Sequence, residues 1–132
     1  MKNDPVKILI VEDEMVIAAN ISLQLSELGY EVMGIVPRGE DALRHVADNR
    51  PDIVLMDINL KGKIDGIETA RQLRSTYGTA IIYLTANADD DHFNRAKSTR
   101  PSAFISKPYK KRDLQRALEL TIENMAHTDE PR

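Results

Sequence analysis

Polar side chains that can bind a cation or a phosphoryl group stand just after four separate apolar runs. Glu12 and Asp13 follow KILIV, and Asp57 follows DIVLM. Thr85 follows AIIYL, and Lys107 follows SAFIS. If these runs are neighbouring parallel strands, the five side chains converge at the carboxyl ends of one sheet, where open α/β folds bind ligands. Such a cluster can hold a metal ion and accept a phosphoryl group.

The three carboxylates favour a divalent metal ion. Glu12 and Asp13 would repel each other and Asp57 unless a cation lay between them. An all-oxygen site of this kind suits Mg²⁺ or Mn²⁺, and a backbone carbonyl near Asn59 could complete the ligand shell. The alternative is that one of the acidic pair caps the following helix and that Asp57 is a structural carboxylate or a loop cap.

Thr85 and Lys107 supply what a carboxylate nucleophile would still lack. Attack of a carboxylate on phosphorus forms an acyl phosphate, and the transferring group spreads negative charge over its oxygens. An ammonium can hold those oxygens, and a hydroxyl can hydrogen-bond one of them. Pro108 biases the backbone at Lys107 away from helix and permits a cis bond, which would hold the approach angle of the lysine. Considered one at a time, each residue has a simpler explanation: Lys107 is a solvated lysine at a strand end, and Thr85 is a turn residue.

Short apolar runs alternate with longer amphipathic segments, which is the pattern of repeated βα units. The predicted strands are residues 6–11, 30–36, 53–56, 80–84 and 103–106. Helices are predicted between the strands and after the last one, where Leu114, Leu118, Ile122 and Met125 form one apolar stripe. The segment 89–98 has only two apolar anchors, Phe93 and Ala96, so we expect a weakly held and mobile helix there.

The composition limits the function classes. A chain of 132 residues makes one domain, predicted over residues 1–126 with a polar tail at 127–132. Lys and Arg total 18 against 21 Asp and Glu, and the net charge of -3 disfavours direct nucleic-acid binding. The absence of cysteine fits a reducing cytosol, and no apolar run is long enough to span a bilayer. We therefore expect a cytoplasmic protein that has no membrane partner.

Together the motifs KILIVEDE, MDINL, DGIE, IIYLTA and FISKPY resemble the receiver domains of two-component response regulators, which histidine kinases phosphorylate on aspartate. The resemblance covers nearly the whole chain. It implies an α/β fold of the flavodoxin-like (βα)5 type, a doubly wound parallel sheet in the order 2-1-3-4-5. The stretches DINLKGKIDGIE and RAKSTRPSAFISKPY look like a variant often linked to sensory and histidine kinase modules. The chain would then be a stand-alone regulator or a segment of a longer protein.

The resemblance also assigns roles residue by residue. The roles that it implies are the phosphoacceptor, Asp57; the metal ligands, Glu12, Asp13, Asp57 and the carbonyl of Asn59; the pair that responds to the phosphoryl group, Thr85 and Lys107; the small residue beside it, Ala86; and the switching aromatic, Phe104. Plain core packing is the alternative for Phe104. Lys61 and the pair Arg100 and Pro101 stand where most receivers have a proline and Gly-Ala, respectively.

The predicted function is a phosphorylation-dependent signalling switch, not an enzyme in the ordinary sense, although it assists its own phosphotransfer and dephosphorylation. Asp57 would take a phosphoryl group, with Mg²⁺, from a histidine kinase, a histidine phosphotransfer protein or a small phosphodonor. Thr85 and Lys107 would then move onto the phosphoryl oxygens, and Phe104 would turn inward. The face made by the 89–98 helix, the last strand and the last helix would carry the signal to a partner that the sequence does not identify.

Three other functions compete with the switch. A degenerate receiver used only for protein binding is disfavoured by the intact acidic set. A phosphatase of the haloacid-dehalogenase kind usually needs a second aspartate two residues after the nucleophile, where this chain has Asn59. A nucleotide-binding module would need a glycine-rich loop after the first strand, and VEDEM has no glycine.

Overall fold

The computed structural model describes residues 5–86 and 90–129. Strand and helix alternate five times along the chain. The elements are β1 (Lys7–Val11), α1 (Met15–Glu27), β2 (Glu31–Val36), α2 (Gly39–Asp48), β3 (Ile53–Asp57), α3 (Gly66–Tyr77), β4 (Ala80–Thr85), α4 (Asp90–Ser98), β5 (Ala103–Ser106) and α5 (Lys111–Asp129). The five predicted strands are therefore all present, and each begins and ends within one residue of its predicted bounds.

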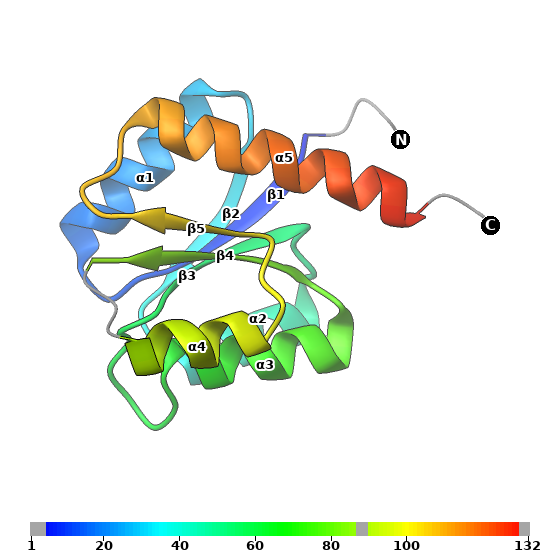
Figure 1. Ribbon diagram of the computed structural model, residues 1–132. Helices are drawn as coiled ribbons and strands as arrows, with labels where there is room; N and C mark the ends of the chain where they lie inside the picture. The colour runs from blue at the N-terminus through cyan, green and yellow to red at the C-terminus, as the bar shows by residue number, and fades with distance from the viewer. Residues whose placement is uncertain (1–4, 87–89, 130–132) are drawn as a thin grey trace.

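The five strands form one parallel sheet in the order β2-β1-β3-β4-β5. Helices α1 and α5 cover one face of the sheet, and α2, α3 and α4 cover the other (Figure 1). The predicted doubly wound α/β fold is confirmed. Every residue of β3 and β4 is buried, which explains their continuous apolar runs. Strand β2 lies at an edge and is only partly buried.

Each central strand contributes to two cores, because successive side chains point to opposite faces of a sheet. Ile8 and Ile10 of β1 pack on the side of α1 and α5. Leu9 and Val11 pack on the side of α2, α3 and α4. A slip of one residue would exchange the two sets, so the packing specifies the strand register. The register in turn brings the polar residues that follow the strands to one edge of the sheet.

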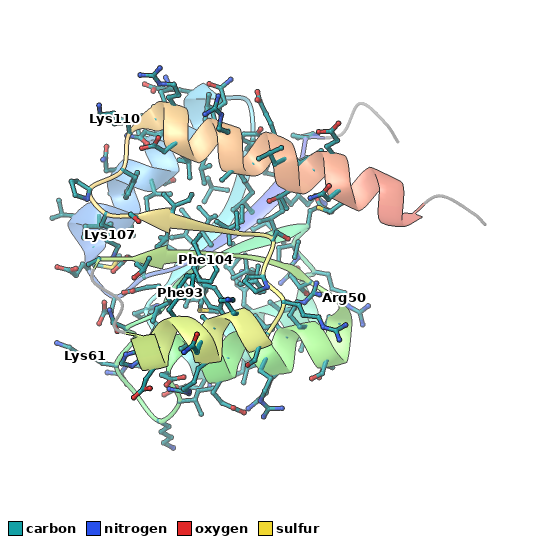
Figure 2. All side chains as sticks on the ribbon, viewed as in Figure 1. Arg50, Lys61, Phe93, Phe104, Lys107 and Lys110 are labelled. Atoms are coloured by element: carbon teal, nitrogen blue, oxygen red, sulfur yellow. The ribbon has the colours of Figure 1, made fainter. Side chains whose placement is uncertain are left out.

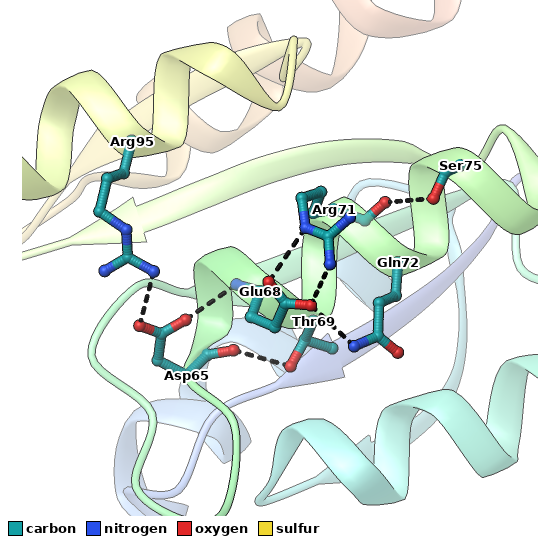
Figure 3. A network of polar contacts seen from close by, with 7 residues as sticks. All are labelled: Asp65, Glu68, Thr69, Arg71, Gln72, Ser75 and Arg95. Atoms are coloured by element: carbon teal, nitrogen blue, oxygen red, sulfur yellow. Dashed lines mark hydrogen bonds and ion pairs between the residues drawn. The ribbon is translucent and has the colours of Figure 1, made fainter.

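Helix α3 begins in a network of polar contacts (Figure 3). The Asp65 carboxylate accepts a hydrogen bond from the backbone N of Glu68 at 2.8 Å, which makes Asp65 the N-cap. Its other carboxylate oxygen lies 3.1 Å from Arg95 of α4. Gly66 packs so closely that an added Cβ would lie 2.0 Å from the backbone oxygen of Asp57. Only glycine fits where α3 approaches the end of β3.

Helix α4 is held by few side chains, as the sequence predicts. Ala96 is its one fully buried residue among positions 91–98. Phe93 keeps 40% of its surface exposed, and its ring lies 4.9 Å from that of Phe104. The ion pair of Arg95 with Asp65 adds a contact at the surface. The predicted mobility of this helix stays a prediction, and residue 89, its predicted start, lies outside the described residues.

Helix α5 continues through Asp129, past residue 127 where the sequence predicts a frayed tail to begin. Ile122 and Met125 pack against the core, and they anchor the helix almost to that point. Residues 130–132 of the predicted tail lie outside the described residues. Among the described helices, none combines the length and the apolar character that crossing a membrane requires.

Candidate functional site

The chemistry-bearing residues follow four strands that end at the same edge of the sheet. The backbone N of Glu12 donates to the carbonyl of Val36 at 3.0 Å, so the pairing of β1 with β2 continues past the strand end. The backbone N of Lys107 donates to the carbonyl of Thr85 at 2.8 Å, which extends the pairing of β4 with β5. Asp57 is paired in register with Leu84. The main chain therefore fixes where each of these side chains starts.

The three acidic residues come together as the sequence predicts. Glu12, Asp13 and Asp57 each offer a carboxylate oxygen, and these oxygens all lie within 4.8 Å of one another. Glu12 and Asp57 are buried, whereas Asp13 is half-buried. All the donors are oxygen atoms, which fits Mg²⁺ or Mn²⁺. No second group of this kind occurs in the part of the chain that the structure describes.

The ammonium of Lys107 lies among these carboxylates. Its Nζ is 3.0 Å from Oε1 of Glu12 and 3.8 Å from Oδ1 of Asp57. Backbone donors hold the same two carboxylates, because the N of Glu14 lies 3.1 Å from Oε2 of Glu12 and the N of Asn59 lies 3.0 Å from Oδ1 of Asp57. These contacts leave Oδ2 of Asp57 as its less engaged oxygen. Lys107 is a partial counter-ion for a cluster of three negative charges.

The electrostatics of Glu12 reflect this imbalance. Burial raises the pKa of the Glu12 carboxyl above its ordinary value, and the negative charge of Asp57 raises it further. The hydrogen bonds from Lys107 and from the backbone of Glu14 act in the opposite direction but do not cancel the effect of burial. A site that disfavours its own negative charge is suited to binding a cation.

Thr85 is buried at the end of β4, and its Oγ1 has no hydrogen-bond partner among the described residues. A buried hydroxyl without a partner is costly, and an oxygen of a bound ligand would satisfy it. Ala86, which follows Thr85, is exposed.

Phe104 is half-buried in an aromatic stack that the sequence does not predict. Its ring lies 5.5 Å from that of Tyr83, with an interplanar angle of 28°, and 4.9 Å from that of Phe93. Figure 2 shows Phe93 and Phe104 between α4 and the sheet. The hydroxyl of Tyr83 lies 2.7 Å from Oγ1 of Thr99, just beyond the end of α4. Tyr83 thus links the strand that ends in Thr85 to both Phe104 and α4.

The structure also describes two other residues that the sequence singles out, Pro108 and Asn59. The peptide bond between Lys107 and Pro108 is cis, as the sequence permits. Asn59 contributes its backbone N–H to Asp57, and the proposed role of its carbonyl as a metal ligand stays a prediction.

An apolar hollow beside the acidic cluster was not evident from the sequence. It has a volume of about 670 Å³ and is lined by Val16, Ile17, Asn20, Ala86, Lys107, Pro108 and Tyr109. Val16 is 85% exposed, and the neighbouring Met15 is 58% exposed. These exposed apolar side chains lie next to the acidic cluster.

Comparisons with known proteins agree with this geometry. A family model described as the response regulator receiver domain matches residues 8–119. The transcriptional regulatory protein PdtaR of Mycobacterium tuberculosis is 34% identical over 118 residues, which make up 89% of this chain and 57% of PdtaR. The chain therefore spans little more than half the length of this curated relative.

Solved structures show the same likeness. The receiver domain of a modulated diguanylate cyclase from Desulfovibrio desulfuricans G20 is 40% identical, with a TM-score of 0.91 over 96% of this chain and 100% of that one. The receiver domain of the sensor histidine kinase PA1611 from Pseudomonas aeruginosa PAO1 is 33% identical, with a TM-score of 0.81 over 91% of this chain and 99% of that one. That structure has a magnesium ion coordinated in its active site cleft.

Proposed function

The chain belongs to the family of response regulator receiver domains, and from this membership we propose that it is a switch phosphorylated on Asp57. Members of this family are in general signalling switches of two-component systems and not classical enzymes. The observation that carries the proposal is the surroundings of the Asp57 carboxylate. Two further carboxylates and the Lys107 ammonium lie at the same edge of the sheet. The Thr85 hydroxyl, which has no partner among the described residues, lies there too.

Glu12, Asp13 and Asp57 would hold Mg²⁺ or Mn²⁺ through carboxylate oxygens, with the carbonyl of Asn59 as a further ligand. The bound cation would neutralise negative charge on the cluster and on the incoming phosphoryl oxygens. Burial and the crowding of negative charge around Glu12 support this assignment. The magnesium ion in the PA1611 receiver is a property of that protein, and it adds support by similarity.

The reacting atom is assigned to Oδ2 of Asp57, because the backbone N–H of Asn59 already holds Oδ1. The Oδ2 atom attacks the phosphorus atom of the donor, and a new oxygen–phosphorus bond forms. The bond from phosphorus to the donor breaks, and its electron pair leaves with the imidazole nitrogen of a phosphohistidine or with the acetate of acetyl phosphate. Asp57 then carries an acyl phosphate, and no other residue changes its covalent structure.

Lys107 and Thr85 respond to the new group. The Lys107 ammonium, now 3.0 Å from Glu12, moves toward the phosphoryl oxygens, and the Thr85 hydroxyl donates a hydrogen bond to one of them. Movement of Thr85 is transmitted along β4 to Tyr83 and across the stack to Phe104 and α4. The small number of contacts that hold α4 supports its part as the responding element.

The phosphoryl donor would be a histidine kinase or a histidine phosphotransfer protein. The apolar hollow beside Lys107 and the exposed Val16 offer such a protein a surface next to Asp57. Neither a direct nucleic-acid contact nor a membrane contact is part of the proposal.

Incubation with acetyl phosphate and Mg²⁺, followed by intact-mass measurement, tests the proposal. The wild type should gain the mass of one phosphoryl group, and the Asp57→Ala variant should gain none. The Asp48→Ala variant is the matched control, because Asp48 is an exposed aspartate at the end of α2, and it should gain the same mass as the wild type. Chelation of the metal should suppress the gain. An equal gain in Asp57→Ala would show that Asp57 is not the phosphoacceptor.

A further inference from the structure

Arginine side chains gather at the opposite edge of the sheet, where α3 and α4 end. A hollow of about 280 Å³ lies there between the two helices. Its lining consists only of arginine and hydroxyl side chains, namely Arg71, Arg74, Ser75, Ser98, Thr99 and Arg100. Arg50 lies near this end of the molecule, far from Lys107 (Figure 2). The lining contains no carboxylate, although the chain carries a net charge of -3.

Two of these guanidinium groups have no counter-ion within salt-bridge distance among the described residues. Arg71 is neutralised by Glu68, which accepts from its Nε at 3.0 Å and from Nη2 (Figure 3). Arg74 and Arg100 form no salt bridge with any other described residue. An adjoining hollow of about 370 Å³ shares both arginines and contains one carboxylate, Asp52, which already accepts from the backbone N of Lys7 at 2.8 Å. Asp52 keeps its negative charge but lies beyond salt-bridge distance of both arginines, so the pair presents two guanidinium groups that no described carboxylate pairs with.

The backbone of Arg100 points to a role for its side chain. Its φ is +57°, in the left-handed region that favours glycine or asparagine. The turn that imposes this conformation is fixed by hydrogen bonds from the N of Thr99 to the carbonyl of Ala96 and from the N of Arg100 to the carbonyl of Lys97. An arginine at such a position is less stable than a glycine would be, and strain of this kind is typical of functional positions. The strained residue carries one of the two free guanidinium groups.

We propose that this hollow binds a phosphate group with two negative charges, carried by a small phosphorylated molecule. Guanidinium groups bind phosphate oxygens in a bidentate manner, and two free arginines match a dianion. The Ser75 and Ser98 hydroxyls already donate to backbone carbonyls, so Arg74 and Arg100 are the donors that the ligand uses. The site is separate from Asp57 and does not depend on its phosphorylation.

A ligand in this hollow would also contact the end of α4. Thr99 lines the hollow, and its Oγ1 donates to the carbonyl of Ala96 at 2.6 Å, so it accepts its second hydrogen bond from Tyr83. Tyr83 in turn stacks on Phe104. A ligand in the hollow would therefore lie beside Thr99, the residue whose hydrogen bond joins the end of α4 to the aromatic stack.

The test is a titration of the ¹⁵N-labelled full chain, followed by NMR, with inorganic phosphate, pyrophosphate and ATP in separate arms. The chelator EDTA is present and Mg²⁺ is left out, so that the acidic cluster takes no part. We expect saturable shifts of the amides of Ser75, Ser98, Thr99 and Arg100. Affinity should fall about tenfold or more in the Arg74→Gln, Arg100→Gln double variant. The control Arg112→Gln, which removes one exposed positive charge from α5, should change the affinity less than about twofold.

The pattern of binding across the three titration arms identifies the kind of ligand. Binding in all three arms assigns the site to a free phosphate group, and binding of ATP alone assigns it to a nucleotide. Absence of saturable shifts in every arm, equal affinity in the double variant, or shifts confined to the surroundings of Lys107 would each overturn the proposal.

A second variant separates binding from folding. Arg100→Gly relieves the left-handed strain and removes the guanidinium, so its Tm should rise while its affinity for pyrophosphate falls. A purely structural role for Arg100 would change the Tm without changing the affinity. Arg100→Gly with wild-type affinity would therefore contradict the proposal.

Discussion

At the scale of single residues, the acidic cluster carries more negative charge than its neighbours compensate. Glu12, Asp13 and Asp57 lie together, and Lys107 is the one cation within salt-bridge distance of them among the described residues. Functional sites commonly lower the stability of the folded protein in this way. The expected consequence is that removing one negative charge stabilises the metal-free protein.

The Asp57→Asn variant tests this imbalance. In EDTA it should be more stable than the wild type by about 1 kcal/mol, because an amide does not repel Glu12 and Asp13. Added Mg²⁺ should stabilise the wild type more than the variant, so that the gap narrows. Thermal or urea unfolding at the two metal conditions measures both effects. If Mg²⁺ leaves the difference in stability between the variant and the wild type unchanged, the assignment of the three carboxylates to a metal site is contradicted.

Thr85 is a neutral residue of the same site, and its buried hydroxyl also lowers the stability of the unphosphorylated protein. Its buried Oγ1 has no partner among the described residues, and Thr85→Val replaces the hydroxyl by a methyl group of similar shape. Urea unfolding should show the unphosphorylated variant to be more stable by about 1 kcal/mol. Acetyl phosphate should still modify Asp57, but the accompanying NMR shifts of Tyr83 and Phe104 should shrink. Undiminished shifts would show that Thr85 does not transmit the signal.

At the scale of secondary structure elements, Asp65 joins two helices. One carboxylate oxygen caps α3 through the backbone N of Glu68, and the other pairs with Arg95 of α4. The cap is a local hydrogen bond within one element. The ion pair lies at the surface, where Arg95 and Asp65 are 51% and 34% exposed, so it contributes little to stability.

Two substitutions of Asp65 separate these contributions. Asp65→Asn keeps a capping oxygen and loses the ion pair, so its free energy of unfolding should fall by only a few tenths of a kcal/mol. Asp65→Ala loses both and should cost about 1 kcal/mol. Urea unfolding of the two variants and the wild type measures the difference. Equal losses in both variants would mean that the ion pair with α4, and not the cap, is the main contribution.

The elements also show what the sequence can and cannot predict. The apolar runs gave the five strands, and the residues directly after them gave the acidic cluster with Lys107, because both depend on local order along the chain. The stack of Tyr83 on Phe104 depends instead on the register between β4 and β5, which pairs the two residues. The hollow between α3 and α4 depends likewise on how two helices end side by side. Neither feature has a signal within a single segment.

At the scale of the whole molecule, each face of the sheet packs on its helices through an extended apolar cluster, and the cluster under α4 contains a buried hydroxyl. The face of α1 and α5 packs through an extended apolar cluster that reaches from Ile8 to Leu118. On the other face, the buried ring of Tyr83 fills the layer under α4, and its hydroxyl bonds to Thr99. A polar group therefore lies inside the core that holds the weakly anchored helix.

Because the Tyr83 hydroxyl is buried, we expect the free energy of unfolding to depend on pH in the alkaline range. Burial raises the pKa of Tyr83 to about 12 from an ordinary value of 10, and the hydrogen bond with Thr99 only partly opposes the shift. The native state keeps the proton where the unfolded chain has lost it. The contribution of Tyr83 to the free energy of unfolding is therefore complete below pH 10 and is lost as the pH rises toward 12.

Tyr83→Phe isolates this contribution. The variant keeps the stack on Phe104 and loses one hydrogen bond, which should cost about 1 kcal/mol at neutral pH. Between pH 10 and about 12 its free energy of unfolding should fall less steeply than that of the wild type, since one late-titrating group is gone. Urea unfolding at successive pH values, with tyrosinate absorbance recorded alongside, gives both slopes. The slope does not depend on the neutral-pH loss, so identical slopes would mean that the Tyr83 hydroxyl titrates in the native state as it does in the unfolded chain.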